Sequence, residues 1–276
     1  MTEPLKTLAI AGHDTSAAGG MDADLKTFEE FGTYGMLALT CVVTMDPDHN
    51  WAHTVHQVPL DILKAQLKTV FAGQPFAAMK TGMLGDEPTV QVAAEAIERH
   101  QMQNVVIDPV MICKGETEVL NPDAADAIRN LLLPLATLTT PNLFEAATLA
   151  QTDPIKTVDD MKNAAVKIHE LGAQTVIVKG GKGLTGTDAI DVFFDGQHFE
   201  TLHSQKRATD KNAGAGCTFA AAAVGALAHG KTPQAAVHIA KDFDTEAIHD
   251  GFQLNQYLGP VFHPAYRLKT QGGLKF

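Results

Sequence analysis

The chain has 276 residues, of which 45% are hydrophobic, and a formal net charge of −11. A chain of this length buries roughly three quarters of its unfolded surface, so one domain over residues 1–276 is the simplest prediction. The acidic charge argues against broad contacts with nucleic acid or an anionic membrane, which require a basic surface. A phosphate ligand must therefore be held by local groups.

Three cysteines, Cys41, Cys113 and Cys217, stand far apart and show no zinc-binding spacing. This pattern indicates a reduced, intracellular protein. The first residues lack the charged and apolar regions of a signal peptide, and no apolar run is long enough to cross a bilayer. We therefore expect a cytoplasmic protein with no membrane partner.

Short β-rich apolar runs alternate with helical patterns along the chain, which predicts an α/β fold with a mostly parallel sheet. The expected strands cover residues 7–11, 37–44, 77–81, 105–107, 138–140, 175–179 and 190–194. The expected helices cover residues 21–31, 59–70, 88–100, 123–133, 143–150, 158–171, 218–228 and 233–249. Ligands of such sheets bind beyond the carboxyl ends of the strands, so the loops there are the candidate site.

The loop after the first strand, residues 12–20, is polar and contains glycine. Asp14 is a candidate for orienting a polar substrate, because its carboxylate accepts hydrogen bonds, and Gly19 is a further candidate contact. Alternatively, Asp14 and Ser16 only cap the loop and the following helix, which is the default for either residue alone.

Asp108 follows a strand and opens a loop that carries a proline, a thiol, a lysine and a glycine. An acidic residue at this place suits a metal–phosphate site with a mobile cover. Val110 and Cys113 of the same loop are candidate substrate contacts. The alternatives are a capping role for Asp108 and a solvated surface position for Lys114.

Asn142 and Glu145 come directly after the strand at 138–140, three residues apart. This spacing is that of a capping box, so a structural role would explain both residues. The functional interpretation places Glu145 against magnesium and Asn142 near the same ion and the phosphates. The presence of Asp108 in the same chain favours function.

Two nucleotide-binding patterns occur in the wrong context. Residues 225–232 match a P-loop but end a predicted helix, and residues 181–186 match a dinucleotide fingerprint but precede a strand. The glycines at 180–181 still let backbone amides approach a phosphate, with a hairpin turn as the alternative. The candidate nucleotide contacts here are Lys179, Gly180, Gly181 and Lys182.

A glycine-rich turn at residues 212–216 opens an alanine-rich helix with Cys217 in its first turn. Unpaired amides and the partial positive charge of a helix start suit a phosphate or a developing oxyanion. The same field is expected to lower the pKa of Cys217 and favour a thiolate. Alternatively, the glycines only let the helix pack closely on the sheet.

These segments together resemble the ribokinase-like superfamily, in the branch of hydroxymethylpyrimidine (phosphate) kinases and pyridoxal kinases. The resemblance covers residues from about 5 to 266 and rests on segments 11–14, 23–26, 80–84, 108–111, 140–145, 178–182 and 214–219. It implies a three-layer α/β/α sandwich without a separate lid domain, usually paired into a homodimer.

The resemblance also implies transfer of the γ-phosphoryl group of ATP, with Mg²⁺, to a hydroxymethyl group on a heteroaromatic ring. Many superfamily members carry an aspartate base where this chain has Cys217, so Cys217 is expected to act as the base. The amides of Gly214, Ala215 and Gly216 are then expected to stabilise the moving phosphoryl group. Ala213 stands where the branch commonly has histidine, so a histidine contribution is absent.

The residue after the second strand bears on the acceptor. Pyrimidine kinases of the branch tend to have a glutamine where this chain has Met45, so a paired contact to the pyrimidine is lost while a pyridine can still stack. Met83 is a further candidate contact. We therefore favour pyridoxal, as in Gram-positive pyridoxal kinases, with pyridoxine and pyridoxamine as further acceptors. The alternatives are a hydroxymethylpyrimidine kinase of thiamine biosynthesis and, more remotely, a non-catalytic ligand-binding protein.

Overall fold

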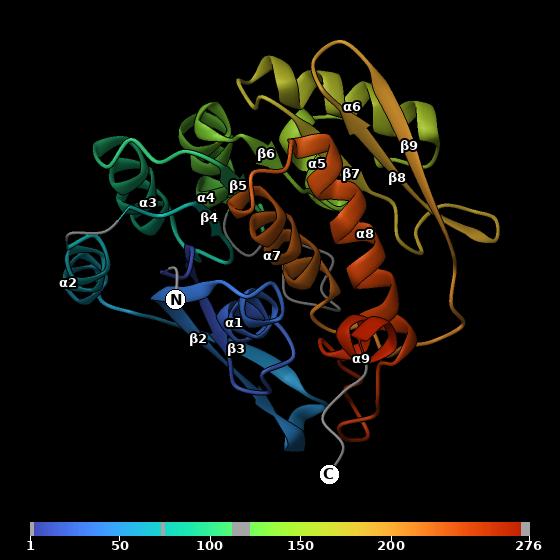
Figure 1. The fold of residues 1–276 in the computed structure, drawn as a ribbon, viewed down its shortest axis with the longest axis horizontal. Helices are drawn as coiled ribbons and strands as arrows, with labels where there is room; N and C mark the ends of the chain where they lie inside the picture. The colour runs from blue at the N-terminus through green and yellow to red at the C-terminus, as the bar shows by residue number, and fades with distance from the viewer. Residues whose placement is uncertain (1–2, 73–74, 112–121, 272–276) are drawn as a thin grey trace.

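One sheet runs through the part of the chain that the structure, a computed structural model, describes: residues 3–72, 75–111 and 122–271. Its order is β3-β2-β1-β4-β5-β6-β7-β8-β9 (Figure 1). The strands are β1 (Lys6–Asp14), β2 (Tyr34–Asp46), β3 (Ala52–Gln57), β4 (Ala78–Thr81), β5 (Val105–Ile107), β6 (Leu138–Thr139), β7 (Val176–Lys179), β8 (Asp188–Phe194) and β9 (Phe199–Gln205).

Six neighbouring strands run parallel, in the spatial order β2, β1, β4, β5, β6 and β7. The strand β3 at one edge and the β8–β9 hairpin at the other are antiparallel to their neighbours. The central parallel strands are apolar because helices cover both of their faces. Their carboxyl ends meet at one edge of the sheet. This arrangement confirms the expected α/β fold with a large, mostly parallel central sheet.

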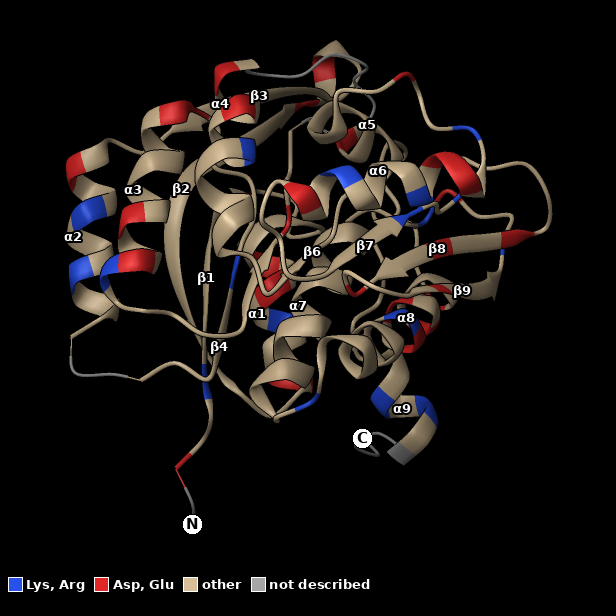
Figure 2. Ribbon diagram, turned by 90° about the horizontal axis from the view of Figure 1, so that it is seen from above, with Lys and Arg blue, Asp and Glu red and all other residues tan. Residues whose placement is uncertain are grey.

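Helices form a layer on each face of the sheet. The helices are α1 (Gly20–Glu30), α2 (Leu60–Val70), α3 (Glu87–Arg99), α4 (Pro122–Ala127), α5 (Leu143–Ala150), α6 (Val158–Glu170), α7 (Ala215–Ala228), α8 (Pro233–His249) and α9 (Ala265–Gln271). One core cluster joins α2 to α6 with one face of the sheet, and a second joins α1, α7 and α8 with the other. Figure 2 shows β6 and β7 between α5 and α6 on one side and α1 and α7 on the other.

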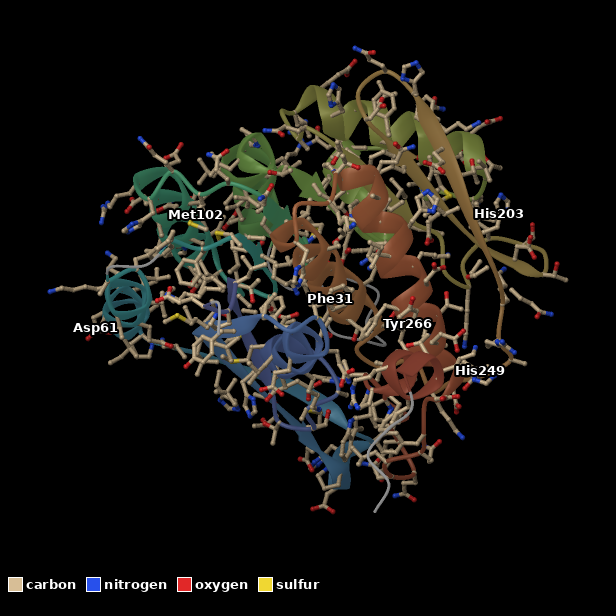
Figure 3. All side chains as sticks on the ribbon, in the orientation of Figure 1. Phe31, Asp61, Met102, His203, His249 and Tyr266 are labelled. Carbon is tan, nitrogen blue, oxygen red and sulfur yellow. The ribbon has the colours of Figure 1, made fainter. Side chains whose placement is uncertain are left out.

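Small residues let α7 approach its neighbours closely. Its alanines are buried from Ala220 to Ala223, and a Cβ atom at Gly225 would lie 2.5 Å from the Phe31 ring. Phe31 and Tyr266 both pack against Phe243 of α8 (Figure 3). The second core cluster therefore fixes where α7 begins, and so fixes the turn before it.

The structure departs from the sequence prediction at the polar edges. The strands β3 and β9 and the short α9 were not predicted, because β3 and β9 are largely exposed and lack the apolar pattern of the central strands. The predicted helix at 123–133 is α4 followed by a π-helical turn, Ile128–Leu132. Within the described ranges, no helix has the length and apolar character needed to cross a membrane.

Candidate functional site

A cavity of about 670 Å³ lies at the carboxyl ends of the parallel strands. Each predicted site residue lines it except Cys113, which lies outside the described residues. The lining predicted residues are Asp14, Gly19, Met45, Met83, Asp108, Val110, Asn142, Glu145, Lys179, Gly180, Gly181, Lys182, Gly214, Ala215, Gly216 and Cys217. The thiol-bearing turn and both acidic residues therefore face one space, while their individual roles stay predictions.

The turn before α7 packs directly on the loop after β1. Gly214 has φ +82°, and a Cβ atom there would lie 1.7 Å from the carbonyl oxygen of Ala18. Only glycine fits such a contact at a left-handed backbone position. The turn thus requires its glycine, and it places the amides of the first turn of α7 at the cavity.

Ala213 has a structural role in the same turn. Its amide donates to the carbonyl of Gly259, and its own carbonyl accepts from the amide of Val261. Its side chain is a buried methyl group, so this position carries no charge. The turn is therefore held from two sides, by residues 259–261 and by the loop at residue 18.

A buried charge cluster lies beneath the turn. The Nζ atom of Lys80 is 2.7 Å from Asp24 Oδ1 and 3.6 Å from Asp108 Oδ2, and Lys80 and Asp24 are 0% exposed. Burial opposes the charge of Lys80, but the two carboxylates outweigh it and raise its pKa. Burial raises the pKa of Asp24 to about 6 despite its lysine partner. This cluster puts a fixed ammonium group between two carboxyl groups.

The expected lowering of the Cys217 pKa is wrong for the protein without ligands. Burial is the largest cause and, with Asp108 and Asp24, raises this pKa to about 12, while Lys80 and the Gly20 amide act in the opposite direction. Burial and the two carboxylates together therefore outweigh Lys80 and the Gly20 amide. This direction favours the protonated thiol in the protein without ligands.

Asp108 and Glu145 have the donor chemistry for a hard divalent cation. Asp108 Oδ1 accepts a 3.1 Å hydrogen bond from Thr140, while its buried Oδ2 has no hydrogen-bond partner. Burial and then Asp108 raise the pKa of Glu145 to about 8, and both carboxyl groups line the same cavity. Mg²⁺ in phosphate sites takes one or two carboxylates, so this pair fits it. No group of three metal-ligating side chains occurs in residues 3–72, 75–111 and 122–271.

The capping interpretation of Asn142 and Glu145 is confirmed as geometry. Asn142 Oδ1 accepts from the Glu145 amide at 3.0 Å, and Glu145 Oε2 accepts from the Asn142 amide at 2.9 Å. This reciprocal pair fixes the start of α5 and holds the Glu145 carboxylate at the cavity. Capping and a role toward a metal are therefore compatible.

Lys179 supplies the positive charge on the side of the β7–β8 turn. Its Nζ atom is 3.7 Å from Asp108 Oδ1, and it lies over the ring of Phe219. The amide of Gly180 donates to Ile190 and Asp191 of β8, so it is committed within the protein rather than open to a phosphate. Lys182 donates to the carbonyl of Thr209.

The opposite wall of the cavity is apolar and comes from the other half of the sheet. Met45 and Met83 pack with Val43 in one hydrophobic cluster. Asp14 accepts hydrogen bonds from Ser16 and from the Gly19 amide, so its loop-capping interpretation is confirmed. This wall offers a flat ring more dispersion contact than polar pairing.

Sequence reasoning missed several charged residues of the site. Lys80 was not predicted as a site residue, although a lysine in an apolar strand is itself a signal of a buried ion pair. Asp191, Lys241 and Asp244 also line the cavity, and no local pattern identified them. Their meeting depends on the packing of α8 against β8, which a single sequence does not encode in its spacing.

Comparison with known proteins assigns the family. A family model described as "Phosphomethylpyrimidine kinase" matches residues 14–262, and the chain belongs to this family. Pyridoxine kinase of Bacillus subtilis is 51% identical over 266 residues, covering 96% of this chain and 98% of the relative.

Solved structures agree with this assignment. An ADP complex of B. subtilis pyridoxal kinase has TM-score 0.93 at 50% identity, covering 96% of this chain and 100% of its own. Staphylococcus aureus pyridoxal kinase with AMP-PCP and pyridoxal has TM-score 0.91 at 47% identity, covering 96% and 95%. The expected family resemblance is thereby confirmed.

We expect Lys80→Met to lower the free energy of unfolding by roughly 3–5 kcal/mol, because it leaves Asp24 buried without its partner. Chemical denaturation measures this loss. The double variant Lys80→Met/Asp24→Leu is the matched control and should recover most of the stability. A loss below about 1 kcal/mol in the single variant would show that the pair contributes little.

Glu145 predicts a specific pH dependence of stability. Because its pKa is raised from 4.5 to about 8, the native state holds an extra proton between these values. Its contribution is therefore present below pH 4.5 and lost as the pH rises through 8. Without Mg²⁺, the free energy of unfolding of the wild type should fall from pH 5 to 8 relative to Glu145→Gln. Parallel curves would contradict the raised pKa.

Proposed function

We propose that the protein transfers the γ-phosphoryl group of ATP to the 5′-hydroxymethyl group of pyridoxal and so forms pyridoxal 5′-phosphate. Pyridoxine and pyridoxamine are further acceptors in this vitamin B6 salvage reaction. The observation that carries the proposal is that Cys217, Asp108, Glu145 and Lys179 face one cavity at the start of α7. Relatives with about 50% sequence identity that are named pyridoxine kinase or pyridoxal kinase support it.

Different residues around the cavity stabilise charge, hold the metal ion and accept the proton. The amides of Gly214, Ala215 and Gly216 and the ammonium of Lys179 stabilise charge on the phosphoryl group during transfer. Asp108 and Glu145 would hold Mg²⁺, which when bound supplies positive charge to the phosphates. Cys217 accepts the proton of the acceptor hydroxyl.

The raised pKa of Cys217 shapes this role. A thiol whose pKa is raised to about 12 in the protein alone is mostly protonated at neutral pH, and the protonated form cannot accept a proton. Lys80 beneath it and the Gly20 amide beside it both favour the thiolate. Further positive charge from a bound cation would lower this pKa and raise the thiolate fraction, so Cys217 would act as a base only in the loaded site, which limits unproductive reactions of a free thiolate.

A hydroxymethylpyrimidine kinase is the second candidate function. The matching family model is described as a phosphomethylpyrimidine kinase, which favours it. Against it, the wall at Met45 and Met83 is apolar and gives no paired contact to a pyrimidine amino group. Losing such a contact lowers discrimination in favour of the pyrimidine, so pyridoxal is the preferred acceptor.

Turnover with defined acceptors tests the activity. We expect Mg²⁺-dependent ADP formation from ATP with pyridoxal, and a lower kcat/KM with hydroxymethylpyrimidine. An incubation without acceptor measures background ATP hydrolysis. A higher kcat/KM for the pyrimidine would assign the second candidate instead, and nucleotide binding without acceptor-dependent turnover would make the protein a non-catalytic binder.

Cys217→Ala tests the base. We expect kcat to fall by about 100-fold or more, with a much smaller change in the KM for ATP, because the base acts on the acceptor hydroxyl. Cys41→Ala is the matched control, since Cys41 is a buried thiol that does not line the cavity. An effect of Cys217→Ala confined to the KM for ATP would remove the assigned role.

Two finer features complete the proposal. The protein is expected to act in the cytoplasm, where ATP is abundant, and to form a homodimer as its family resemblance implies. Light scattering of the purified protein measures its oligomeric state, and a monomeric mass would contradict the dimer.

A further inference from the structure

Asp244 of α8 is an acidic group of the cavity that the proposed reaction does not use. The residue lines the cavity and is half-buried, and its Oδ1 atom is enclosed without a hydrogen-bond partner. An enclosed carboxylate oxygen without a donor costs free energy. A ligand that supplies a donor at this place would remove that cost.

The neighbouring cations are committed to other carboxylates. Lys241, one helical turn before Asp244, donates at 2.7 Å to Asp191 Oδ2 and at 3.1 Å to the carbonyl of Ala189. Lys179 forms its ion pair with Asp108 at 3.7 Å. Both lysines act on Asp244 only from a distance, and burial outweighs them and raises its pKa to about 8.

The position of Asp244 links it to the predicted nucleotide contacts. Asp191, the partner of Lys241, also accepts a hydrogen bond from the Gly180 amide at 3.0 Å. This chain of contacts ties α8 to the β7–β8 turn. Asp244 is three residues from Lys241, on the same side of the helix, and Ile248 continues this cavity wall toward the helix end.

The chemistry of ATP restricts what Asp244 can contact. The triphosphate is anionic, so an unpaired carboxylate beside it would repel it. The hydrogen-bond donors of ATP are the ribose hydroxyls and the amino group of adenine. Acidic side chains accept from ribose hydroxyls in other nucleotide sites.

Resting on the proposed use of ATP, we propose that Asp244 is a specificity-determining residue that accepts a hydrogen bond from the nucleoside part of the nucleotide. It selects nucleotides that carry a donor at that point. The donor is a ribose hydroxyl or the adenine amino group, and nucleotide analogues distinguish these two sources.

Calorimetric titration tests this inference with Mg²⁺ and without acceptor. The probes are ATP, 2′-deoxyATP, 3′-deoxyATP, purine riboside triphosphate, which lacks the amino group, and inorganic tripolyphosphate. We expect the wild type to bind one analogue about 5-fold or more weakly than ATP, the factor that one hydrogen bond typically contributes. Asp244→Leu should bind ATP weaker by the same factor and lose that discrimination, with tripolyphosphate unaffected.

Two variants serve as controls. Asp244→Asn keeps an acceptor oxygen and should keep part of the discrimination. Asp242→Asn removes an exposed carboxylate from the same helix and should bind every probe as the wild type does. Thermal unfolding of each variant with and without ATP separates a folding defect from a binding defect.

Three outcomes would overturn the inference. Asp244→Leu could bind ATP within twofold of the wild type or more tightly, could lose affinity equally for every probe including tripolyphosphate, or could keep the discrimination of the wild type. None of these depends on turnover. A wild type that selects nucleotides through Asp244 yet forms no ADP with pyridoxal would contradict the proposed function and leave this inference standing.

Discussion

The buried ammonium group of Lys80 is the constraint on which the site depends. It is fully enclosed between Asp24 of α1 and Asp108 after β5, so three separate segments must meet for any of these charges to be tolerated. Removing one partner would leave an uncompensated charge in the core. The same ammonium group favours the thiolate of Cys217. The ion pairs that hold α1, β4 and the segment after β5 together therefore also act on the pKa of Cys217.

A second constraint is the close contact between two turns. Gly214 lies against the carbonyl of Ala18, and α7 behind it is held against α1 through Gly225 and Phe31. These contacts determine where the first amides of α7 stand relative to the loop after β1. The separation of α7 from α1 and from the loop after β1 is therefore set by glycines whose missing Cβ atoms allow close contact.

Much of this arrangement was predictable from the sequence because many of the predicted residues stand at the carboxyl end of a strand or in the loop that follows it. Parallel strands bring such positions to one edge, so Asp108, Glu145 and Lys179 were placed together correctly. The edge strands β3 and β9 escaped prediction because their outward faces carry polar residues without apolar alternation.

The pKa values of the site could not be predicted from the sequence. The direction of the Cys217 pKa depends first on its burial and then on the charged groups around it, and Asp24 and Asp108 reach it from distant parts of the chain. Likewise, Lys241 and Asp244 reach the cavity only because α8 is packed beside β8.

The two walls of the cavity come from opposite halves of the sheet, with Met45 and Met83 on one and Lys179 and Asp244 on the other. Each wall is built by its own strands, and only the thiol and the acidic groups between them are shared. If the apolar wall contacts the acceptor as proposed, substitutions along β2 are expected to change the small-molecule alcohol while the nucleotide contacts are retained. Such a division makes the scaffold evolvable, since new acceptors can be acquired by drift in a few apolar side chains.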